Sequence, residues 1–497
     1  MADAVLTFQV PAEQGVRVRR ALLSAVTPAR RLRLLCADTA GGDLAAAGLT
    51  LHLRHEGRRW TQVLSRAAGP PPRLEQAIPL PAQAGQVPVI DVHRHAHTAW
   101  RDALPPAVLE GGAAIEVQVQ VRMERVQRTV RSGATRVQVT FDQGDVQRGK
   151  TRWPLCVVRF ERLAGPPIGL VALAARWIER HGLYLVAGGW LHLAPGPAQP
   201  TETDSVTFAA ASPLAPLLEP DAALRALVGS CLDHLLPNAA RLAAGSGGPE
   251  HLHQTRVALR RLRTALRVLG HWSQGVDPQW NATLGEVFSR LGARRDRDAL
   301  SASLLPALMA AGAPTVELPP ASQTGSPADV LRGAACNRVL VELLAFSADA
   351  PLASDTDPEL VNRPAADPMP ATLARPLLNR LHRRIATEAE DFLNVDDAAR
   401  HRTRKRLKRL RYSAEFVAPL FPSKAVARYL GPLRAAQDAL GAFNDLAVAE
   451  LAFRAQVEHD ARAWFAVGWL AARRPACLLE CRRALQDLAQ AQRFWKT

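Results

Sequence analysis

Residues 253–269 read HQTRVALRRLRTALRVL, and this stretch decides the interpretation of the second half of the chain. A related stretch, HRTRKRLKRLRYSAEFV, occupies residues 401–417, which lie 148 positions further along. Three cationic positions align at this offset: His253 with His401, Arg256 with Arg404, and Arg260 with Lys408. A second motif recurs one residue out of step: Leu291-Gly292 and Arg295-Asp296 match Leu440-Gly441 and Asn444-Asp445. Two motifs repeated at nearly one offset predict an internal duplication.

Both stretches have the spacing of an α-helix with one cationic side and one apolar side. When successive residues are placed 100° apart, the leucines of each stretch gather opposite a stripe of cations. The stripes contain His253, Arg256, Arg260, Arg263 and Arg267 in the first stretch, and His401, Arg404, Lys408 and Arg411, beside Lys405, in the second. Residues 401–411 include seven Lys or Arg and no acid, so this stripe repels itself. It is either a solvated face balanced by acids on another helix or a surface that binds a polyanion, and the duplication favours the second.

The composition limits the classes of partner. The chain has 497 residues, a formal charge of +16 and a pI of about 10.7. A chain this basic favours a polyanion, which could be nucleic acid, an acidic membrane surface or inorganic polyphosphate. We expect a cytoplasmic protein outside the membrane, because the N-terminus lacks a secretory pattern and no apolar stretch approaches the length of a membrane span.

Neither the six cysteines nor the histidines of the first half predict a metal site. Cys477 and Cys481 share a helix face, but no second pair of ligands follows them, so we expect buried free thiols rather than zinc. His93, His95 and His97 would share one face of a strand and could then hold a metal. Their Pro-rich surroundings favour a surface loop instead, and no metal is expected.

The first 200 residues have strand-like alternation, whereas the rest has helical periodicity. Strands with one solvated face are predicted at residues 49–55, 114–123 and 135–144. Residues 213–300, 330–346 and 371–497 are predicted to be helical, and residues 313–330 and 349–371 to be loops. The predicted fold class is α+β multidomain, with an antiparallel β domain followed by an all-α bundle. The predicted boundaries are 1–200 for the β domain, 201–214 for a linker and 215–497 for the bundle, whose two repeats span about 215–346 and 371–497.

The helical half resembles the CHAD domain, a conserved histidine α-helical domain, over roughly residues 215–497. The resemblance rests on the two basic stretches, the Leu-Gly motifs, Gln437 and the closing Phe494-Trp495. It implies a pseudo-twofold helical bundle and a basic channel, lined by the two stripes, that binds inorganic polyphosphate. Such a ligand has no bases, so repeated cations suffice, with Arg as a planar fork and Lys as a point charge. Polyphosphate granules in the cytoplasm are then a candidate location.

Nucleic acid is the weaker alternative ligand. Proteins that bind single strands combine a basic groove with aromatic side chains on which bases stack. Only 5% of the residues here are aromatic, and the basic stretches contain little beyond Tyr412, which we expect to be packed. Arg295 and Asp296 are expected to be structural. Protonated His253 and His401 could bind phosphate, or each imidazole could cap or pack at the start of its helix.

The N-terminal half resembles a CYTH domain, the antiparallel β tunnel of inorganic triphosphatases and class IV adenylate cyclases. The resemblance rests on Asp38-Thr39, residues 44–54, residues 59–64 and residues 141–144. It implies a charged tunnel in which Mg²⁺ or Mn²⁺ orients triphosphate for hydrolysis. CYTH followed by CHAD is also a recurrent pairing of domains.

Most of the residues that the CYTH resemblance requires are missing. The opening strand, residues 5–9, lacks the acid pair and the lysine of the family, and the later acidic strand keeps only Glu161. The residual tunnel residues would be Arg54, Arg125 (or Arg122), Asp142, Arg159 and Glu161. A two-metal site needs more carboxylates than Asp142 and Glu161 supply, so we expect no catalytic residue and no bound metal. The alternative is an active, metal-dependent inorganic triphosphatase whose helical domain binds the polyanion.

Overall fold

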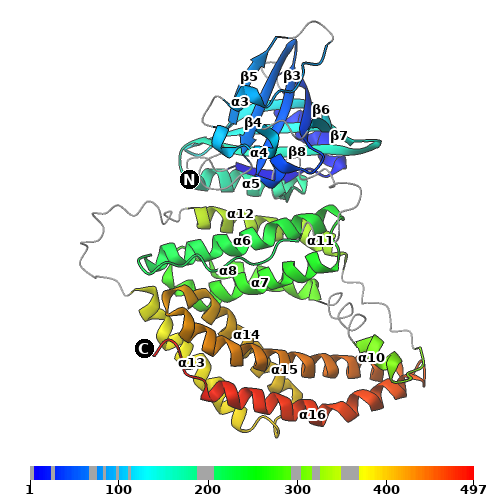
Figure 1. The fold of residues 1–497 in the computed structure, drawn as a ribbon, viewed down its shortest axis with the longest axis vertical. Coiled ribbons are helices and arrows are strands. Elements are labelled where there is room, and N and C mark those ends of the chain that lie inside the picture. Colours follow the sequence, from blue (N-terminus) through cyan, green and yellow to red (C-terminus); the bar gives the residue numbers. More distant parts are fainter. Residues whose placement is uncertain are drawn as a thin grey trace. The chain divides into compact units, whose positions relative to one another are not determined.

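The chain forms two compact units in the computed structural model (Figure 1). The described residues are 5–23, 28–66, 75–81, 86–96, 100–109, 114–186, 206–292, 304–315, 325–348 and 369–496. The N-terminal unit contains a β-sheet, together with residues 243–246 and 331–345, and the C-terminal unit contains the other described residues and is helical. The predicted order, an antiparallel sheet followed by helices, is confirmed.

A nine-stranded sheet dominates the N-terminal unit, and its strand order is β5-β4-β3-β2-β6-β7-β8-β1-β9. Neighbouring strands in the sheet pair antiparallel. The strands are β1 (Val5–Gln9), β2 (Arg30–Thr39), β3 (Leu49–Glu56), β4 (Arg59–Arg66), β5 (Glu75–Leu80), β6 (Ile115–Ser132), β7 (Thr135–Arg148), β8 (Thr151–Ala164) and β9 (Tyr184–Leu185). The three strands predicted from alternation are β3, β6 and β7, and the last two are longer than predicted.

Short helices connect the strands, and two of the helices cover one face of the sheet. The helices are η1 (Ala12–Gln14), α1 (Gly15–Leu22), α2 (Asp43–Ala46), α3 (His93–Ala96), η2 (Arg101–Ala103), α4 (Pro106–Leu109) and α5 (Pro167–His181). Helices α1 and α5 pack on β6 and β7, and α5 also packs on β8. The ring of Trp177 on α5 meets that of Phe160 on β8 edge to face, with 5.4 Å between the centroids.

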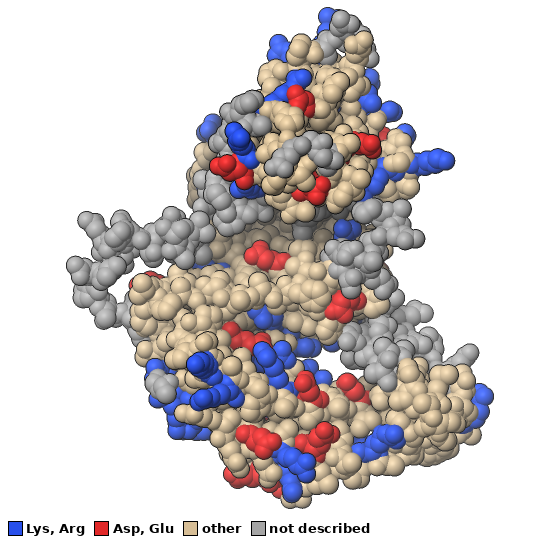
Figure 2. Space-filling model, viewed as in Figure 1, with Lys and Arg blue, Asp and Glu red and all other residues tan. Residues whose placement is uncertain are grey.

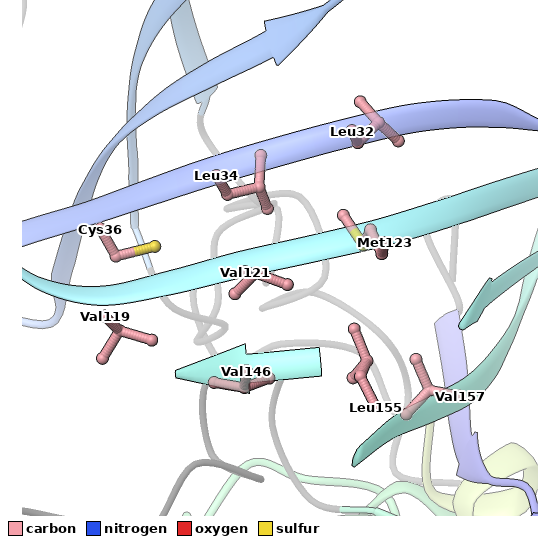
Figure 3. Packing of buried hydrophobic residues seen from close by; sticks show 9 residues of the cluster. All are labelled: Leu32, Leu34, Cys36, Val119, Val121, Met123, Val146, Leu155 and Val157. Carbon is pink, nitrogen blue, oxygen red and sulfur yellow. The ribbon is translucent and has the colours of Figure 1, made fainter. Parts of the chain in front are cut away.

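The opposite face of β2, β6, β7 and β8 carries a buried apolar cluster (Figure 3). The members are no more than 6% exposed: Leu32, Leu34, Cys36, Val119, Val121, Met123, Val146, Leu155 and Val157. Asp142 pairs with Val157 across β7 and β8, so the predicted tunnel residues share this face with the cluster. This face is therefore a packed core over these four strands, while the other face of β6 carries Gln120 and the exposed Arg122, in keeping with the predicted alternation of one apolar and one solvated face.

Helices of very different lengths build the C-terminal unit (Figure 1). They are α6 (Pro220–Ala244), α7 (Pro249–Leu269), η4 (Gly270–Trp272), α8 (Pro278–Arg290), α10 (Leu305–Ala310), α11 (Pro327–Arg332), α12 (Ala334–Ala348), α13 (Pro370–Glu390), α14 (Asp397–Val417), η7 (Ala418–Leu420), α15 (Ser423–Gln456) and α16 (Ala463–Gln490). Residues 331–345, in α11 and α12, belong to the N-terminal unit. Helix α11 begins inside the span 313–330 that was predicted to be a loop, so that prediction is wrong over residues 327–330.

Helices α7 and α14 start and end 148 positions apart, which is the offset found in the sequence. Each has 21 residues and leads into a three-residue 3₁₀ helix. Both begin one turn before the predicted start, because Pro249 opens α7 and the Asp396 carboxylate accepts a hydrogen bond from the Ala399 N–H at 2.7 Å. His253 and His401 therefore lie in the second turn, and the alternative that they cap helix starts does not hold.

Several smaller predictions are resolved by the described residues. All six cysteines are free and buried, and Tyr412 is packed, as predicted. His93 and His95 lie in α3 rather than on a strand, and His97, Arg295 and Asp296 are outside the described residues. Most of the predicted Pro/Asp-rich loop, residues 349–368, is outside them as well. None of the described helices combines the length and the apolar character needed to cross a membrane.

Candidate anion-binding site

Helices α7 and α14 lie against each other, and one buried arginine of α7 contacts α14. Arg261 on α7 is 8% exposed, and its Nη1 lies 3.8 Å from Oε2 of Glu415 on α14. The same guanidinium lies 5.3 Å from the ring centroid of Phe416. The predicted apolar side is buried in both helices, at Leu259, Leu262, Leu266 and Leu269 in α7 and at Leu407 and Leu410 in α14. The apolar sides are thus buried in the protein, while Arg260 of one stripe lies near Lys408 of the other.

Lys408 of α14 lies among cations from both helices. Its side chain is half-buried, and burial, followed by the charges of Arg260 and Arg404, lowers the pKa of its amino group to about 6. Arg256 lowers this pKa further, whereas Asp445 of α15 opposes the shift. Among the described residues, neither Lys408 nor Arg260 forms an ion pair with a carboxylate. The two predicted stripes therefore converge on Lys408, with one nearby acid against three guanidinium groups.

The ring of Phe288 on α8 contacts three arginines of α7. The guanidinium carbons of Arg256, Arg260 and Arg263 lie 4.4, 5.1 and 5.7 Å from the Phe288 ring centroid. Nη1 of Arg256 also donates a hydrogen bond to the Phe288 carbonyl oxygen at 3.1 Å. A ring face attracts cations through its quadrupole, which offsets part of the repulsion among the three charges. The ring thus holds three like charges in one place without neutralising them.

Two glycines on the same side as Phe288 let the arginines approach. A Cβ atom at Gly285 would lie 2.9 Å from Nη2 of Arg263, and one at Gly292 would lie 3.0 Å from Nη1 of Arg256. Both distances are closer than ordinary van der Waals contact, so a larger residue would displace the guanidinium groups. Gly292 belongs to a motif that the sequence singled out, but Gly285 and Phe288 were missed. Their spacing of three and four residues was a visible signal of one helix face.

His401 contacts the second motif found in the sequence. Its Nδ1 lies 3.0 Å from Oδ1 of Asn444, and Nδ2 of Asn444 donates to Asp445 at 3.4 Å. Burial lowers the pKa of His401 below its usual value of 6.5; the Asn444 hydrogen bond opposes this shift, and the nearby cations, first Lys405, add to it. The imidazole is therefore mainly neutral at pH 7, and a bound anion would favour its protonated form.

The remaining stripe residues have different surroundings. Arg411 donates from Nε to Oε1 of Glu415 at 2.8 Å, so its charge is balanced within α14. Arg267 and Lys405 are exposed, and His253 is half-buried on α7. Arg256 is only 8% exposed, so its guanidinium group faces the interior and Phe288 more than it faces solvent. The residues best placed for a ligand are Arg260, Arg263, His401, Arg404 and Lys408, which we call the α7–α14 cluster.

In the N-terminal unit, the predicted tunnel residues are largely paired with one another or with neighbours. Arg125 donates from Nε and Nη2 to the two carboxylate oxygens of Asp142, at 2.6 and 2.8 Å, and Asp142 is 4% exposed. Nη1 of Arg54 lies 3.6 Å from a carboxylate oxygen of Glu75. Glu161 is exposed, and it lies four residues along β8 from Val157, the partner of Asp142.

This arrangement is poorly suited to holding a metal. Both carboxylate oxygens of Asp142 accept hydrogen bonds from the guanidinium group of Arg125. A metal cation would have to displace this group and would be repelled by its positive charge. Arg159 pairs in register with Thr140 and Thr7, on the strand that carries Glu161 and between it and Val157. In the described part of the chain, no group of three His, Cys, Asp or Glu side chains is placed to bind a metal ion.

Residues 226–454 match the family model of the CHAD domain, so the helical unit contains a CHAD domain. A solved CHAD domain from the plant Ricinus communis is 29% identical, with a TM-score of 0.44 over 59% of this chain and 99% of its own. A candidate adenylate cyclase from Bacillus halodurans is 13% identical, with a TM-score of 0.26 over 38% of this chain and 95% of its own.

A candidate adenylyl cyclase from Hippeastrum, described as having a dominant triphosphatase activity, is also similar. It is 17% identical, with a TM-score of 0.28 over 37% of this chain and 90% of its own. No protein of curated function matches the sequence.

Proposed function

We propose that the helical unit binds inorganic polyphosphate at the α7–α14 cluster. The observation that carries the proposal is the convergence of Arg260, Arg404 and Arg256 on Lys408, which Asp445 alone opposes among the described residues that act on it. Such a group of cations is costly to assemble in a folded protein unless a ligand supplies the missing negative charge. Polyphosphate supplies repeated negative charges with no bulky substituents, which suits a half-buried cluster formed by two helices.

The geometry favours polyphosphate over a nucleic acid strand. Stacking of bases needs accessible aromatic faces, but the ring of Phe288 is already engaged by the guanidinium groups of α7. Arginine forks and a lysine point charge recognise phosphate oxygens directly. Polyphosphate granules in the cytoplasm would present this ligand in bulk.

The test is a comparison of matched double variants by titration calorimetry with long-chain polyphosphate. Arg260→Gln/Lys408→Met removes two basic side chains from the cluster, while Arg256 stays because it is buried against Phe288. The control, Arg58→Gln/Arg131→Gln, removes two charges at exposed positions of the N-terminal unit that form no ion pair. We expect the cluster variant to lose at least about tenfold in affinity and the control to lose little.

Two outcomes would contradict the proposal. One is equal loss in the cluster and control variants, which would indicate an effect of net charge alone. The other is tighter binding of single-stranded DNA than of polyphosphate in a competition experiment at one salt concentration, since affinities for polyanions depend strongly on salt. Circular dichroism would check that both variants keep their helices.

A further inference from the structure

A second basic surface lies on α13, outside the α7–α14 cluster. A groove of about 990 Å³ runs along this helix, and its lining includes Arg375, Arg380, Arg383 and Arg384. Arg380 and Arg383 are exposed and form no ion pair among the described residues, whereas Arg384 lies 3.6 Å from Glu388. In Figure 2 several Lys and Arg side chains gather over the region of α13 and α14. The groove is thus lined by cations and one acid, Glu388.

The corresponding face of α6, in the first half of the helical unit, has a different character. Helices α6 and α13 start 150 positions apart, at Pro220 and Pro370, and at this offset the buried Leu377 and Leu378 match the buried Leu227 and Val228. Arg380 and Arg383 then match Ser230 and Asp233, so this face is cationic on α13 and not on α6. Arg380 lies three and four residues before Arg383 and Arg384, a spacing at which like charges on one helix repel each other.

Cations connect the groove to the α7–α14 cluster. On α7, Arg263 is near both Arg260 and Arg267, whose charges, after burial, lower its pKa. Across the helix contact, Arg409 of α14 is near Arg267 and Arg406, which lower its pKa in the same way. Through Arg267, which acts on both Arg263 and Arg409, the cations of α7 are near those of α14.

Glu388 joins the last step to the groove. It pairs with Arg406 of α14 and lies 3.6 Å from Nε of Arg384 on α13, while Thr403 donates a hydrogen bond to its other oxygen at 2.9 Å. Arg406 and Arg384 thus share one carboxylate, which holds the two helices together and leaves a surplus of positive charge. The groove from Arg375 to Arg384 is about 14 Å long at the rise of an α-helix.

We propose that the α13 groove is a second phosphate-binding subsite, and that one long polyphosphate chain occupies the α7–α14 cluster and this groove together. The inference rests on the proposed function and adds a selectivity to it. A chain long enough to follow the series of cations contacts both subsites, whereas tripolyphosphate is short enough to occupy the cluster alone. The protein therefore prefers long chains over short ones.

The experiment compares long-chain polyphosphate with tripolyphosphate for three double variants and the wild type. The groove variant is Arg380→Gln/Arg383→Gln, since neither side chain has an ion-pair partner whose charge would be exposed by the change. The cluster variant is Arg260→Gln/Lys408→Met, and the control is Arg58→Gln/Arg131→Gln. All three lose two basic side chains, so they differ mainly in where on the protein these side chains are lost.

We expect the groove variant to lose about tenfold in affinity for the long chain and to bind tripolyphosphate as the wild type does. Its affinity for the long chain should also depend less on salt: the slope of log affinity against log salt concentration should be smaller in magnitude by about one to two. The cluster variant should lose affinity for both ligands, and the control should change neither by a comparable factor. Melting curves verify that all variants are folded.

The outcomes separate the two proposals. If the groove variant binds the long chain as tightly as the control does, the second subsite is wrong while binding at the cluster stands. If the groove variant loses affinity for both ligands equally, the groove does not select long polyphosphate chains over tripolyphosphate, and the second proposal is wrong. If the wild type binds neither ligand, the proposed function itself fails.

Discussion

Lys408 should take up a proton when the α7–α14 cluster binds a polyanion. With a pKa of about 6 in the free protein, its amino group is charged in only about a tenth of the molecules at pH 7. Burial is the largest cause of this low pKa, and the guanidinium groups of Arg260, Arg404 and Arg256 add to it, against Asp445. Phosphate oxygens next to the amino group favour its charged form and raise its pKa. Binding at pH 7 to 8 should therefore consume close to one proton at this residue.

The proton uptake can be measured by calorimetry in two buffers that differ in ionisation enthalpy. The affinity of the wild type for polyphosphate should fall by up to about tenfold per pH unit above pH 6, until the pH reaches the pKa of the complex. His401, whose pKa lies below its usual value, adds proton uptake mainly at lower pH, so the interval from pH 7 to 8.5 reports Lys408.

The matched variant is Lys408→Arg, because arginine stays charged throughout this range. It should bind polyphosphate with little pH dependence above pH 7 and with almost no buffer-dependent heat. If the wild type and Lys408→Arg show the same proton uptake and the same pH profile, Lys408 is already charged in the free protein. The account of a strained cationic cluster would then be refuted.

Three further predictions follow from the same structure. The pKa of Lys408 in the folded protein lies below the unfolded value of 10.5, so the unfolded chain binds more protons between about pH 6 and 10.5, and stability rises with pH through this window. Replacing this residue in Lys408→Met should therefore raise the Tm of the free protein, most near pH 6. An unchanged Tm at that pH would contradict this. Arg125→Met leaves Asp142 buried without its partner and should lower the free energy of unfolding by about 3 kcal/mol in urea, with most of this recovered in Arg125→Met/Asp142→Leu; equal losses in the single and double variants would argue against it. The full chain should release no phosphate from inorganic triphosphate with Mg²⁺ or Mn²⁺, because Asp142 is held by Arg125; steady release that Asp142→Ala or Glu161→Ala abolishes would make the N-terminal unit an enzyme.

The repeated stretches could be located from sequence because helix periodicity is a local property. The ends at Leu269 and Val417, the buried leucines and the offset between the helices were all predicted from spacing. The starts were placed one turn late, although Pro249 and Asp396 are ordinary signals of a helix start.

The rest of the site depends on contacts between elements far apart in the chain. Phe288 and Gly285 order the arginines only because α8 packs against α7, and no periodicity within α8 names its partner. The pairing of Arg411 with Glu415 could be predicted from their spacing of four residues. That Glu415 also lies near Arg261 could not, because this contact depends on where α7 packs. In the sheet, alternation showed that residues share a face, but not that apolar residues of four strands would fill the face carrying Asp142.

The central claim is that phosphate groups bind between α7 and α14. It is tested most directly by an experimental structure of the full chain with bound long-chain polyphosphate. The account predicts phosphate oxygens within hydrogen-bond distance of Nζ of Lys408 and of the guanidinium group of Arg260, with Phe288 still beneath the arginines. A bound chain that lies elsewhere on the protein, with Lys408 and Arg260 contacting only solvent, would contradict the account.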